Sequence, residues 1–340
     1  MRALVCHAYG PIDSLKVEDI PQPVPKAGEV LVRVRAAGVS FAAMLGVQGK
    51  HQNKPALPYV PGNELAGHVV ALGDGVTNVA VGDRIATGVS QGAFAEYATA
   101  AAANLVQIPE IMPYAEATNF PTLYPTAYGA LKWKANLQPG EVLLVHGAGG
   151  GSGLTAIEVG KAMGAVVIAS AGGADKLKAA GEAGADHLID YRSEDLRAKV
   201  LDLTGGRGAD VIYDPVGGSA FEASLRCVAP EGRIIPMGFA SGTVPQIPAN
   251  ILLVKNVTVI GFYYGYWNGW GGKGVPSPKE AEALVKRRAL VAEAQKDLTR
   301  WFTEGKLKAT VAATYDLADW VKAFRLIEER TVVGKAVLVP

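Results

Sequence analysis

A glycine-rich segment between residues 141 and 170 constrains the fold of this 340-residue chain more than any other feature. The apolar run from Val142 to Val145 predicts a strand buried on both faces, and the run from Val166 to Ile168 predicts a second one. A turn rich in glycine lies between them, and apolar residues at helical spacing follow it: Leu154, Ile157 and Met163. The segment therefore predicts a strand–turn–helix–strand unit of a parallel sheet.

The glycine turn of this unit predicts a site for the pyrophosphate of a dinucleotide. Glycine lets backbone N–H groups approach phosphate oxygens, and the positive end of the following helix faces them. The alternative is a turn that merely joins packed elements, but the flanking strands and the helix that the motif requires are all present. The predicted contacts are Gly149, Gly150, Gly151, Ser152 and Gly153.

The end of the second strand predicts which dinucleotide binds. Folds that prefer NAD usually carry Asp or Glu about 20 residues after the glycines, where it bonds the ribose 2′-hydroxyl. Here residues 169–173 contain no acid, although Asp175 follows shortly afterwards. Small polar and cationic groups suit a 2′-phosphate, which Arg can bind with two parallel hydrogen bonds. We therefore predict NADPH as the cofactor, contacted here by Ser170, Gly172, Lys176, Tyr191 and Arg192. The alternative is that Lys176 and Arg192 are ordinary surface charges.

The composition excludes several other classes of protein. The net charge of +1 and the pI of about 7.7 do not indicate a protein that binds nucleic acid or an anionic membrane. No apolar run reaches 18 residues, and the N-terminus begins as a strand rather than a signal peptide. Two cysteines, Cys6 and Cys227, are too few for a disulfide framework or a zinc cluster. We expect a soluble, cytoplasmic protein of two domains.

The two halves of the chain differ in their pattern. Residues 1 to about 125 are rich in strand-like runs, and glycines punctuate those between 61 and 86, which is typical of a small, tightly turned barrel. From about 126 to 265, buried strands alternate with helices, which predicts a doubly wound parallel sheet. Ligands bind outside the C-terminal ends of such strands. We expect cofactor contacts there from Val216, Met237, Gly238, Phe239, Phe262 and Tyr263.

Two motifs together resemble the medium-chain dehydrogenase/reductase superfamily. The run Pro61-Gly62…Glu64…Ala66-Gly67…Gly73…Gly82-Asp83-Arg84 is similar to the signature of its GroES-like half. The glycine turn at 147–153 falls where the cofactor domain of that superfamily has its own. The resemblance covers essentially the whole chain. It implies an α/β protein with a GroES-like β-barrel domain at 1–125, completed by about 266–340, and a Rossmann NADPH-binding domain at 126–265.

The zinc positions of the superfamily indicate a branch within it. Zinc-binding members carry Cys and His where this chain has Ser40 and Asn63, and hydroxyl and amide groups are poor zinc ligands. Alanine-rich residues 99–103 replace the four-cysteine lobe. The chain is thus similar to the metal-free quinone oxidoreductase, or zeta-crystallin-like, branch. The resemblance implies a zinc-independent NADPH:quinone oxidoreductase that forms a homodimer or homotetramer. Ser40 replaces the usual Asn of that branch, which leaves the substrate open.

The resemblance and the aromatic residues give an expected acceptor site. Quinone oxygens can take protons from solvent, so no protein acid is obligatory. We predict Ser40 and Asn63 as the polar groups at the acceptor oxygen, and Thr126 is similar to a family residue that faces the nicotinamide; a hydroxyl bonded to its own helix is the alternative. Phe41, Tyr128 and Tyr264 are the predicted substrate contacts. The aromatic run 262–270 could also be a dimer contact or plain core.

Two other functions stay open from the sequence. The first is NADPH-dependent reduction of the C=C bond of an enone or an enoyl thioester, which needs a proton at the α-carbon and, for a thioester, a larger pocket. The second is a structural or regulatory protein that binds NADPH with little catalysis, and the presence of a whole cofactor domain argues against it. Nucleic acid and membrane are not expected partners.

Overall fold

The computed structural model describes residues 1–52, 54–268 and 277–340, and these form two compact units. The first unit is Met1–Thr122 with Ala309–Pro340, and the second is Leu123–Lys308. The sequence predicts a return to the first domain at about residue 266, but the chain returns at Ala309. The reason is the long helix α10 (Pro278–Thr303), which packs on the second unit through contacts such as Trp301 against Tyr128.

The first unit is built on a seven-stranded, mostly antiparallel sheet, in which the chain's C-terminal strand is the second strand from one edge. Its order is β14-β15-β3-β4-β5-β7, with β6 also paired to β3, and β1 pairs separately with β2. Alternating apolar residues of β3 point into a core that includes Val32, Leu65, Phe94 and Phe324. The strands are β1 (Arg2–Val5), β2 (Lys16–Asp19), β3 (Glu29–Val39), β4 (Glu64–Leu72), β5 (Arg84–Gly88), β6 (Tyr97–Ala101), β7 (Val106–Gln107), β14 (Val311–Asp316) and β15 (Lys335–Val339). The α-helices are α1 (Phe41–Val47), α2 (Tyr114–Ala117) and α11 (Trp320–Glu328).

One strand of this unit lies elsewhere than predicted. The sequence predicts a strand over residues 92–98, but β6 begins at Tyr97. The preceding backbone bends at Phe94 and bonds two different segments: the N–H of Phe94 bonds the carbonyl of Pro61, and Ala95 forms an isolated bridge with Ala3 of β1. The Phe94 ring is buried in the core, and a regular strand does not form where the hydrophobic pattern predicts one.

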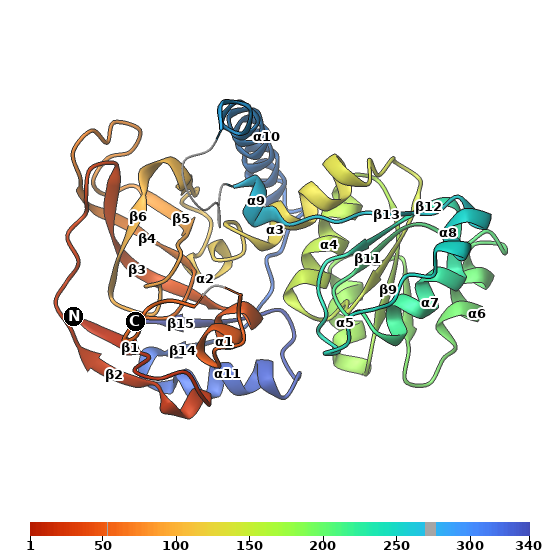
Figure 1. Cartoon of the computed structure of the whole chain (residues 1–340), viewed down its shortest axis with the longest axis horizontal. Helices are drawn as coiled ribbons and strands as arrows, with labels where there is room; N and C mark the ends of the chain where they lie inside the picture. Colours follow the sequence, from red (N-terminus) through yellow and green to blue (C-terminus); the bar gives the residue numbers. More distant parts are fainter. Residues whose placement is uncertain (53, 269–276) are drawn as a thin grey trace. The chain divides into compact units, whose positions relative to one another are not determined.

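The second unit is a six-stranded parallel sheet with helices on both faces, as predicted. The strand order is β10-β9-β8-β11-β12-β13. All strands are parallel, but successive strands are added toward one edge up to β10 and toward the other edge from β11 onward, so the order switches between β8 and β11. Figure 1 shows α4 and α5 on one face and α6, α7 and α8 on the other. The strands are β8 (Val142–His146), β9 (Val166–Ala171), β10 (His187–Asp190), β11 (Ala209–Asp214), β12 (Val228–Pro236) and β13 (Thr258–Val259). The helices are α3 (Leu123–Tyr128), α4 (Gly151–Ala162), α5 (Ala174–Glu182), α6 (Leu196–Leu203), α7 (Ser219–Cys227), α8 (Ala249–Lys255), α9 (Tyr264–Trp267) and α10.

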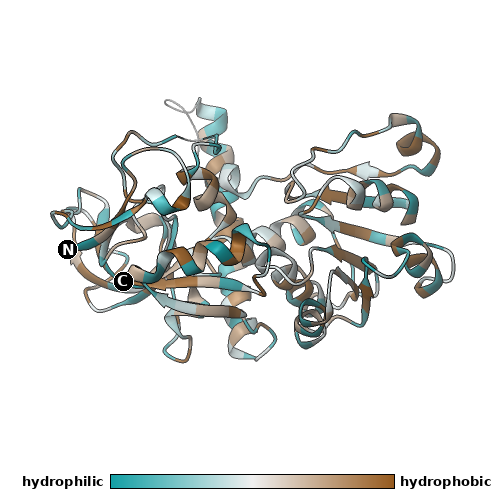
Figure 2. Ribbon diagram, turned by 90° about the horizontal axis from the view of Figure 1, so that it is seen from below, coloured by the Kyte–Doolittle hydropathy of each residue, from teal (hydrophilic) through white to brown (hydrophobic). Residues whose placement is uncertain are grey.

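The hydrophobic pattern explains this sheet and also its weakest strand. The central strands are apolar on both faces, and the hydrophobic colour in Figure 2 runs along them. The expected sixth strand, residues 256–262, is reduced to the two residues of β13. It pairs only with β12, so no second partner strand extends the ladder within the described part of the chain.

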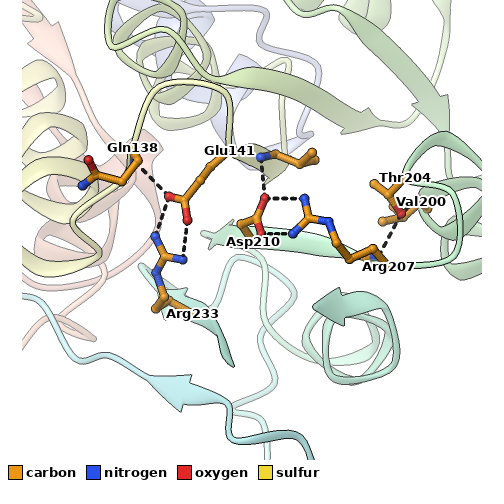
Figure 3. A network of polar contacts seen from close by, with 9 residues as sticks. Gln138, Glu141, Val200, Thr204, Arg207, Asp210 and Arg233 are labelled. Atoms are coloured by element: carbon orange, nitrogen blue, oxygen red, sulfur yellow. Dashed lines mark hydrogen bonds and ion pairs between the residues drawn. The ribbon is translucent and has the colours of Figure 1, made fainter. Parts of the chain in front are cut away.

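A network of ion pairs fixes the amino ends of the central strands (Figure 3). The carboxylate of Glu141 receives two hydrogen bonds from the Arg233 guanidinium, at 2.9 and 2.7 Å. Asp210 is bound by Arg207 and also accepts the N–H of Val142 at 2.8 Å. Burial alone would raise the pKa of the Asp210 carboxyl, but these hydrogen bonds outweigh burial and lower that pKa.

The first unit contains a buried ion pair of its own. Lys335 of β15 donates from Nζ to the Glu64 carboxylate of β4 and, at 2.8 Å, to the carbonyl of Thr118. Both side chains are buried, with exposed fractions of 3% and 5%. The pair joins the C-terminal strand to the strand that follows the Pro61-Gly62 motif. As for the membrane, none of the helices in the described ranges is both long and apolar enough to span one.

We predict that Lys335→Met destabilises the first unit by about 3–5 kcal/mol, because it leaves the Glu64 carboxylate buried without its charge partner. The double variant Glu64→Leu/Lys335→Met should recover a large part of that loss, since it removes both charges. Urea denaturation followed by circular dichroism measures both. Lys322→Met, which removes an exposed ion pair with Asp319, is the control and should change little. A double variant as unstable as the single one would contradict this account.

Candidate functional site

The glycine turn brings backbone very close to backbone at the start of α4. A Cβ atom on Gly153 would lie 2.3 Å from the carbonyl oxygen of Gly147 and 2.7 Å from Cα of Ala148, so no larger residue fits. Gly150 is the N-cap of α4 and supplies no side chain, which leaves the first N–H groups of the helix without a side-chain cap. This is the open, positively polarised helix end that a pyrophosphate requires.

The side chain of Ser152 is held at this turn by a residue of the sheet. Its hydroxyl oxygen lies 2.9 Å from that of Tyr213, which projects from the central strand β11 and is fully buried. Burial raises the pKa of Tyr213 to about 12, while the hydrogen bond with Ser152 acts in the opposite direction. Tyr213 therefore stays a neutral hydroxyl at ordinary pH, and it orients Ser152 at the start of α4.

The predicted 2′-phosphate contacts gather at the end of β9. A Cβ atom on Gly172 would lie 2.7 Å from Nε of Arg192 and 2.8 Å from the hydroxyl oxygen of Tyr191, so both side chains pass directly over that glycine. A Cβ atom on Gly149 would similarly lie 2.5 Å from Cβ of Lys176, which places Lys176 against the glycine turn. Tyr191 and Arg192 are exposed, and Ser170 is buried in the strand.

Two further loops at the same edge of the sheet carry the other predicted cofactor contacts. The side chain of Val216 reaches Gly147, where an added Cβ atom would lie 3.2 Å from its Cγ2. The N–H of Met237 bonds the carbonyl of Asp214 at 2.7 Å, and Gly238 lies against Pro215. These backbone bonds join the loops that follow β11 and β12 into one layer beside the glycine turn.

The aromatic residues of the second unit form a stacked cluster around α3. Trp133 and Trp267 stack at 4.7 Å, and Phe262 and Tyr128 contact them edge-on. Thr126 is half-buried on the same helix α3. Of the predicted aromatic run, Trp270 lies outside the described residues.

Two of the predicted substrate contacts are buried side chains with hydroxyl partners. Tyr128 donates to the Asp297 carboxylate at 2.6 Å and accepts from Lys132 at 2.6 Å, and burial together with the Asp297 bond raises its pKa. Tyr264 is 3% exposed, and burial raises its pKa too. Tyr263, by contrast, is 53% exposed. A role of the two buried tyrosines at the substrate stays a prediction.

In the first unit, the two predicted acceptor contacts lie together. Ser40 donates from Oγ to Oδ1 of Asn63 at 3.3 Å. The same Oγ accepts the N–H of Ala43 and thereby caps α1, a helix that the sequence analysis did not identify. Phe41, the first residue of α1, is 47% exposed. Glu64 is a structural carboxylate, because it is paired with Lys335.

Tyr213 and Asp214 contact the predicted cofactor residues Ser152 and Val216, but neither was itself predicted from the sequence as a site residue. A signal existed, since polar groups at the C-terminal end of a parallel strand point toward the ligand edge of such a sheet. The contact between Tyr213 and Ser152 could not be predicted from the sequence, because the two residues are 61 positions apart.

These geometries predict that Gly153→Ala weakens dinucleotide binding at least about tenfold, since the methyl group must push α4 away from Gly147. Fluorescence titration with NADPH measures the change. Gly181→Ala is a matched control, because a Cβ atom there meets nothing closer than 3.5 Å. Equal affinity of the Gly153→Ala variant and the wild type would exclude this turn from the binding site.

Comparison with known proteins agrees with both units. Residues 26–110 match the family model described as alcohol dehydrogenase GroES-like domain, and residues 151–273 match the one described as zinc-binding dehydrogenase. The quinone oxidoreductase-like protein 2 homolog of Nematostella vectensis is 38% identical, over 99% of this chain and 88% of the relative. The quinone oxidoreductase of Escherichia coli complexed with NADPH has a TM-score of 0.88 at 28% identity, with 100% of both chains covered. The CurK enoyl reductase has a TM-score of 0.83 at 26% identity, covering 99% of this chain and 98% of its own.

A GroES-like unit and a doubly wound unit with a glycine turn together define the architecture of a two-domain dehydrogenase or reductase. The chain belongs to the medium-chain dehydrogenase/reductase superfamily, among its quinone oxidoreductase-like members. One of the matched models is named for zinc, yet in residues 1–52, 54–268 and 277–340 no three His, Cys, Asp or Glu side chains are grouped to hold a metal ion.

Proposed function

We propose that this protein is an NADPH-dependent reductase that transfers a hydride to a quinone without the help of a metal. The observation that carries the proposal is the arrangement of Tyr191 and Arg192 over Gly172, at the end of a strand without an acid. The Arg192 side chain is exposed and forms no ion pair within the described residues; its guanidinium lies over Gly172 and Gly173, where an anionic ligand can reach it. The NADPH complex of the Escherichia coli relative supports the same cofactor.

The residues of the second unit fit NADPH as follows. The N-terminal turn of α4 would bind the pyrophosphate through Gly149, Gly150, Gly151, Ser152 and Gly153. Lys176, Tyr191 and Arg192 would bind the 2′-phosphate, beside Ser170 and Gly172. When bound, the cofactor supplies a hydride from C4 of its nicotinamide. Thr126, Phe262 and Tyr263, with the loops at Val216 and at 237–239, are the proposed contacts of the nicotinamide half.

The acceptor is proposed to be a quinone for chemical reasons. A quinone becomes a hydroquinone by taking up one hydride from NADPH and one proton, and that proton can come from solvent, so no acid of the protein is required. Ser40 and Asn63 would then hydrogen-bond the acceptor oxygen, a role that fits their mutual hydrogen bond and partial exposure. Phe41, Tyr128 and Tyr264 remain the proposed substrate contacts. Hydroxyl and amide groups suit this role better than metal ligation.

A second candidate, reduction of the C=C bond of an enone or enoyl thioester, is favoured by one observation. The CurK enoyl reductase covers nearly the whole chain at a similar TM-score. Such a reaction requires a proton at the α-carbon, and no buried acid in the described first unit is free to give one, because Glu64 is bound by Lys335. The quinone is therefore the preferred acceptor.

We expect Arg192→Ala to raise the Kd for NADPH about 10- to 100-fold, because it removes a charge-assisted, bidentate contact with the 2′-phosphate. The Kd for NADH should not change, since NADH lacks that phosphate. Fluorescence titration with both nucleotides measures the two constants. Arg197→Ala, on the exposed surface of α6, is the matched control. A parallel loss of NADH affinity would place Arg192 outside the 2′-phosphate site.

Turnover with a soluble ortho-quinone, followed at 340 nm, is expected with NADPH and should persist after treatment with a chelator. Activity that the chelator abolishes and zinc restores would overturn the metal-free proposal. Absence of turnover, with NADPH still bound, would exclude the quinone, and an enone or an enoyl thioester would then be assayed in the same way.

A homodimer or homotetramer is also proposed, through the edge of the sheet at β13. The surface there carries apolar side chains, including Leu253 and Val254 at 77% exposed and Val244 at 67%. An unpaired strand edge flanked by apolar groups favours association. Light scattering after gel filtration should give twice or four times the chain mass, and Val254→Asp should shift it toward the monomer. A wild-type monomer would refute the proposal.

A cytoplasmic location is proposed on the basis of the cysteines. Cys6 and Cys227 are free, buried thiols, and burial raises the pKa of each. Reduced thiols of this kind suit a reducing compartment. Cell fractionation tests the location directly.

A further inference from the structure

Asp214 is a fully buried carboxylate at the C-terminal end of the central strand β11. Its Oδ1 atom accepts two backbone N–H groups, from Val216 at 2.8 Å and from Gly217 at 3.0 Å. Its backbone carbonyl accepts the N–H of Met237 at 2.7 Å. Its Oδ2 atom is buried and has no hydrogen-bond partner within the described residues.

The turn that this carboxylate holds has a conformation that needs support. Gly217 and Gly218 have φ angles of +70° and +54°, and a Cβ atom on Gly217 would lie 2.9 Å from the carbonyl oxygen of Thr243. The hydrogen bond from Gly217 is buried and that from Val216 is partly buried, so the carboxylate satisfies backbone donors that have little access to solvent. Without the carboxylate they would lose their partner, and the turn would lose its anchor.

The turn at residues 215–218 also binds the loop at residues 237–241. The carbonyl of Pro215 accepts the N–H of Ala240 at 3.1 Å, and the carbonyl of Val216 accepts the N–H of Ser241 at 3.0 Å. Residues 215–218 and 237–241 therefore form one hydrogen-bonded layer that rests on Asp214. On its other side, Val216 contacts the glycine turn at Gly147.

We propose that Asp214 is a positioning residue of the cofactor site. It fixes the backbone of 215–218 directly and that of 237–241 through the carbonyl bonds just described, so that both loops present a preformed surface to the nicotinamide half of NADPH. The inference rests on the proposed function, because it assumes that these loops contact the cofactor.

A second aspartate of the same strand shows what a purely structural carboxylate looks like here. Asp210 is also buried, at 8% exposed, and also accepts a backbone N–H, from Val142. It lies at the opposite end of β11, where Arg207 pairs with it, and none of its partners is a predicted cofactor contact (Figure 3). Asp210 and Asp214 are therefore a matched pair in one strand.

The experiment compares Asp214→Val and Asp214→Asn with Asp210→Val. Asp214→Val should raise the Kd for NADPH at least about tenfold. Asp214→Asn keeps a carbonyl oxygen that can accept both N–H groups, and should stay within about threefold of the wild type. Asp210→Val should lower the urea midpoint while leaving the Kd unchanged. Equal increases in Kd for the two valine variants, or no increase for Asp214→Val, would overturn the proposal.

Hydrogen exchange of the nucleotide-free protein provides a readout that does not depend on the proposed cofactor. Asp214→Val, or Asp214→Ser if the valine variant does not fold, should speed exchange in both 215–218 and 237–241, and Asp210→Val should not. Unchanged exchange in either loop would refute the positioning role. A wild type that fails to bind NADPH, with the loops still loosened by the Asp214 variants, would instead refute the proposed function alone.

Discussion

The close approach of Gly153 to the carbonyl of Gly147 is the constraint on which the second unit depends. It allows α4 to begin directly beyond the end of β8, with its first N–H groups uncapped at the ligand edge of the sheet. Several of the predicted cofactor contacts are placed relative to this turn. Lys176 lies against Gly149, Val216 against Gly147, and Ser152 is held by Tyr213 from the sheet below.

The buried carboxylates of the chain show how the fold divides its polar groups between stability and function. Glu64 is matched by Lys335, and Asp210 by Arg207, so both charges are neutralised where they are buried. Asp214 accepts hydrogen bonds from backbone N–H groups, in the loops beside the glycine turn, and the buried imidazole of His146 interacts with it electrostatically. A buried polar atom without a hydrogen-bond partner, such as Oδ2 of Asp214 in the described part of the chain, is costly, and such cost is commonly found where a site requires a fixed geometry.

Most of the fold could be predicted from the sequence, and the failures have physical causes. Periodicity located β8, β9 and β11, because strands buried on both faces read as continuous apolar runs. The first domain was predicted to resume at about residue 266, which would include α10, but α10 belongs to the second unit. The capping box at the start of α10 and its apolar residues predict a helix, but they do not predict which surface the helix covers. The strand expected at 92–98 begins only at Tyr97, because the preceding residues bond two different segments of the chain instead of one neighbouring strand.

The sequence by itself determined the two-domain architecture, the glycine turn and the residue types available at its edge, because these depend on local spacing and on the absence of side chains. Only the tertiary structure decided which side chains meet. Tyr191 and Arg192 reach Gly172 because β10 pairs in parallel with β9, and Ser40 meets Asn63 because β3 and β4 pair antiparallel, with Ala37 opposite Leu65. Such contacts join residues that are distant in sequence, and only the completed packing of the sheets specifies them.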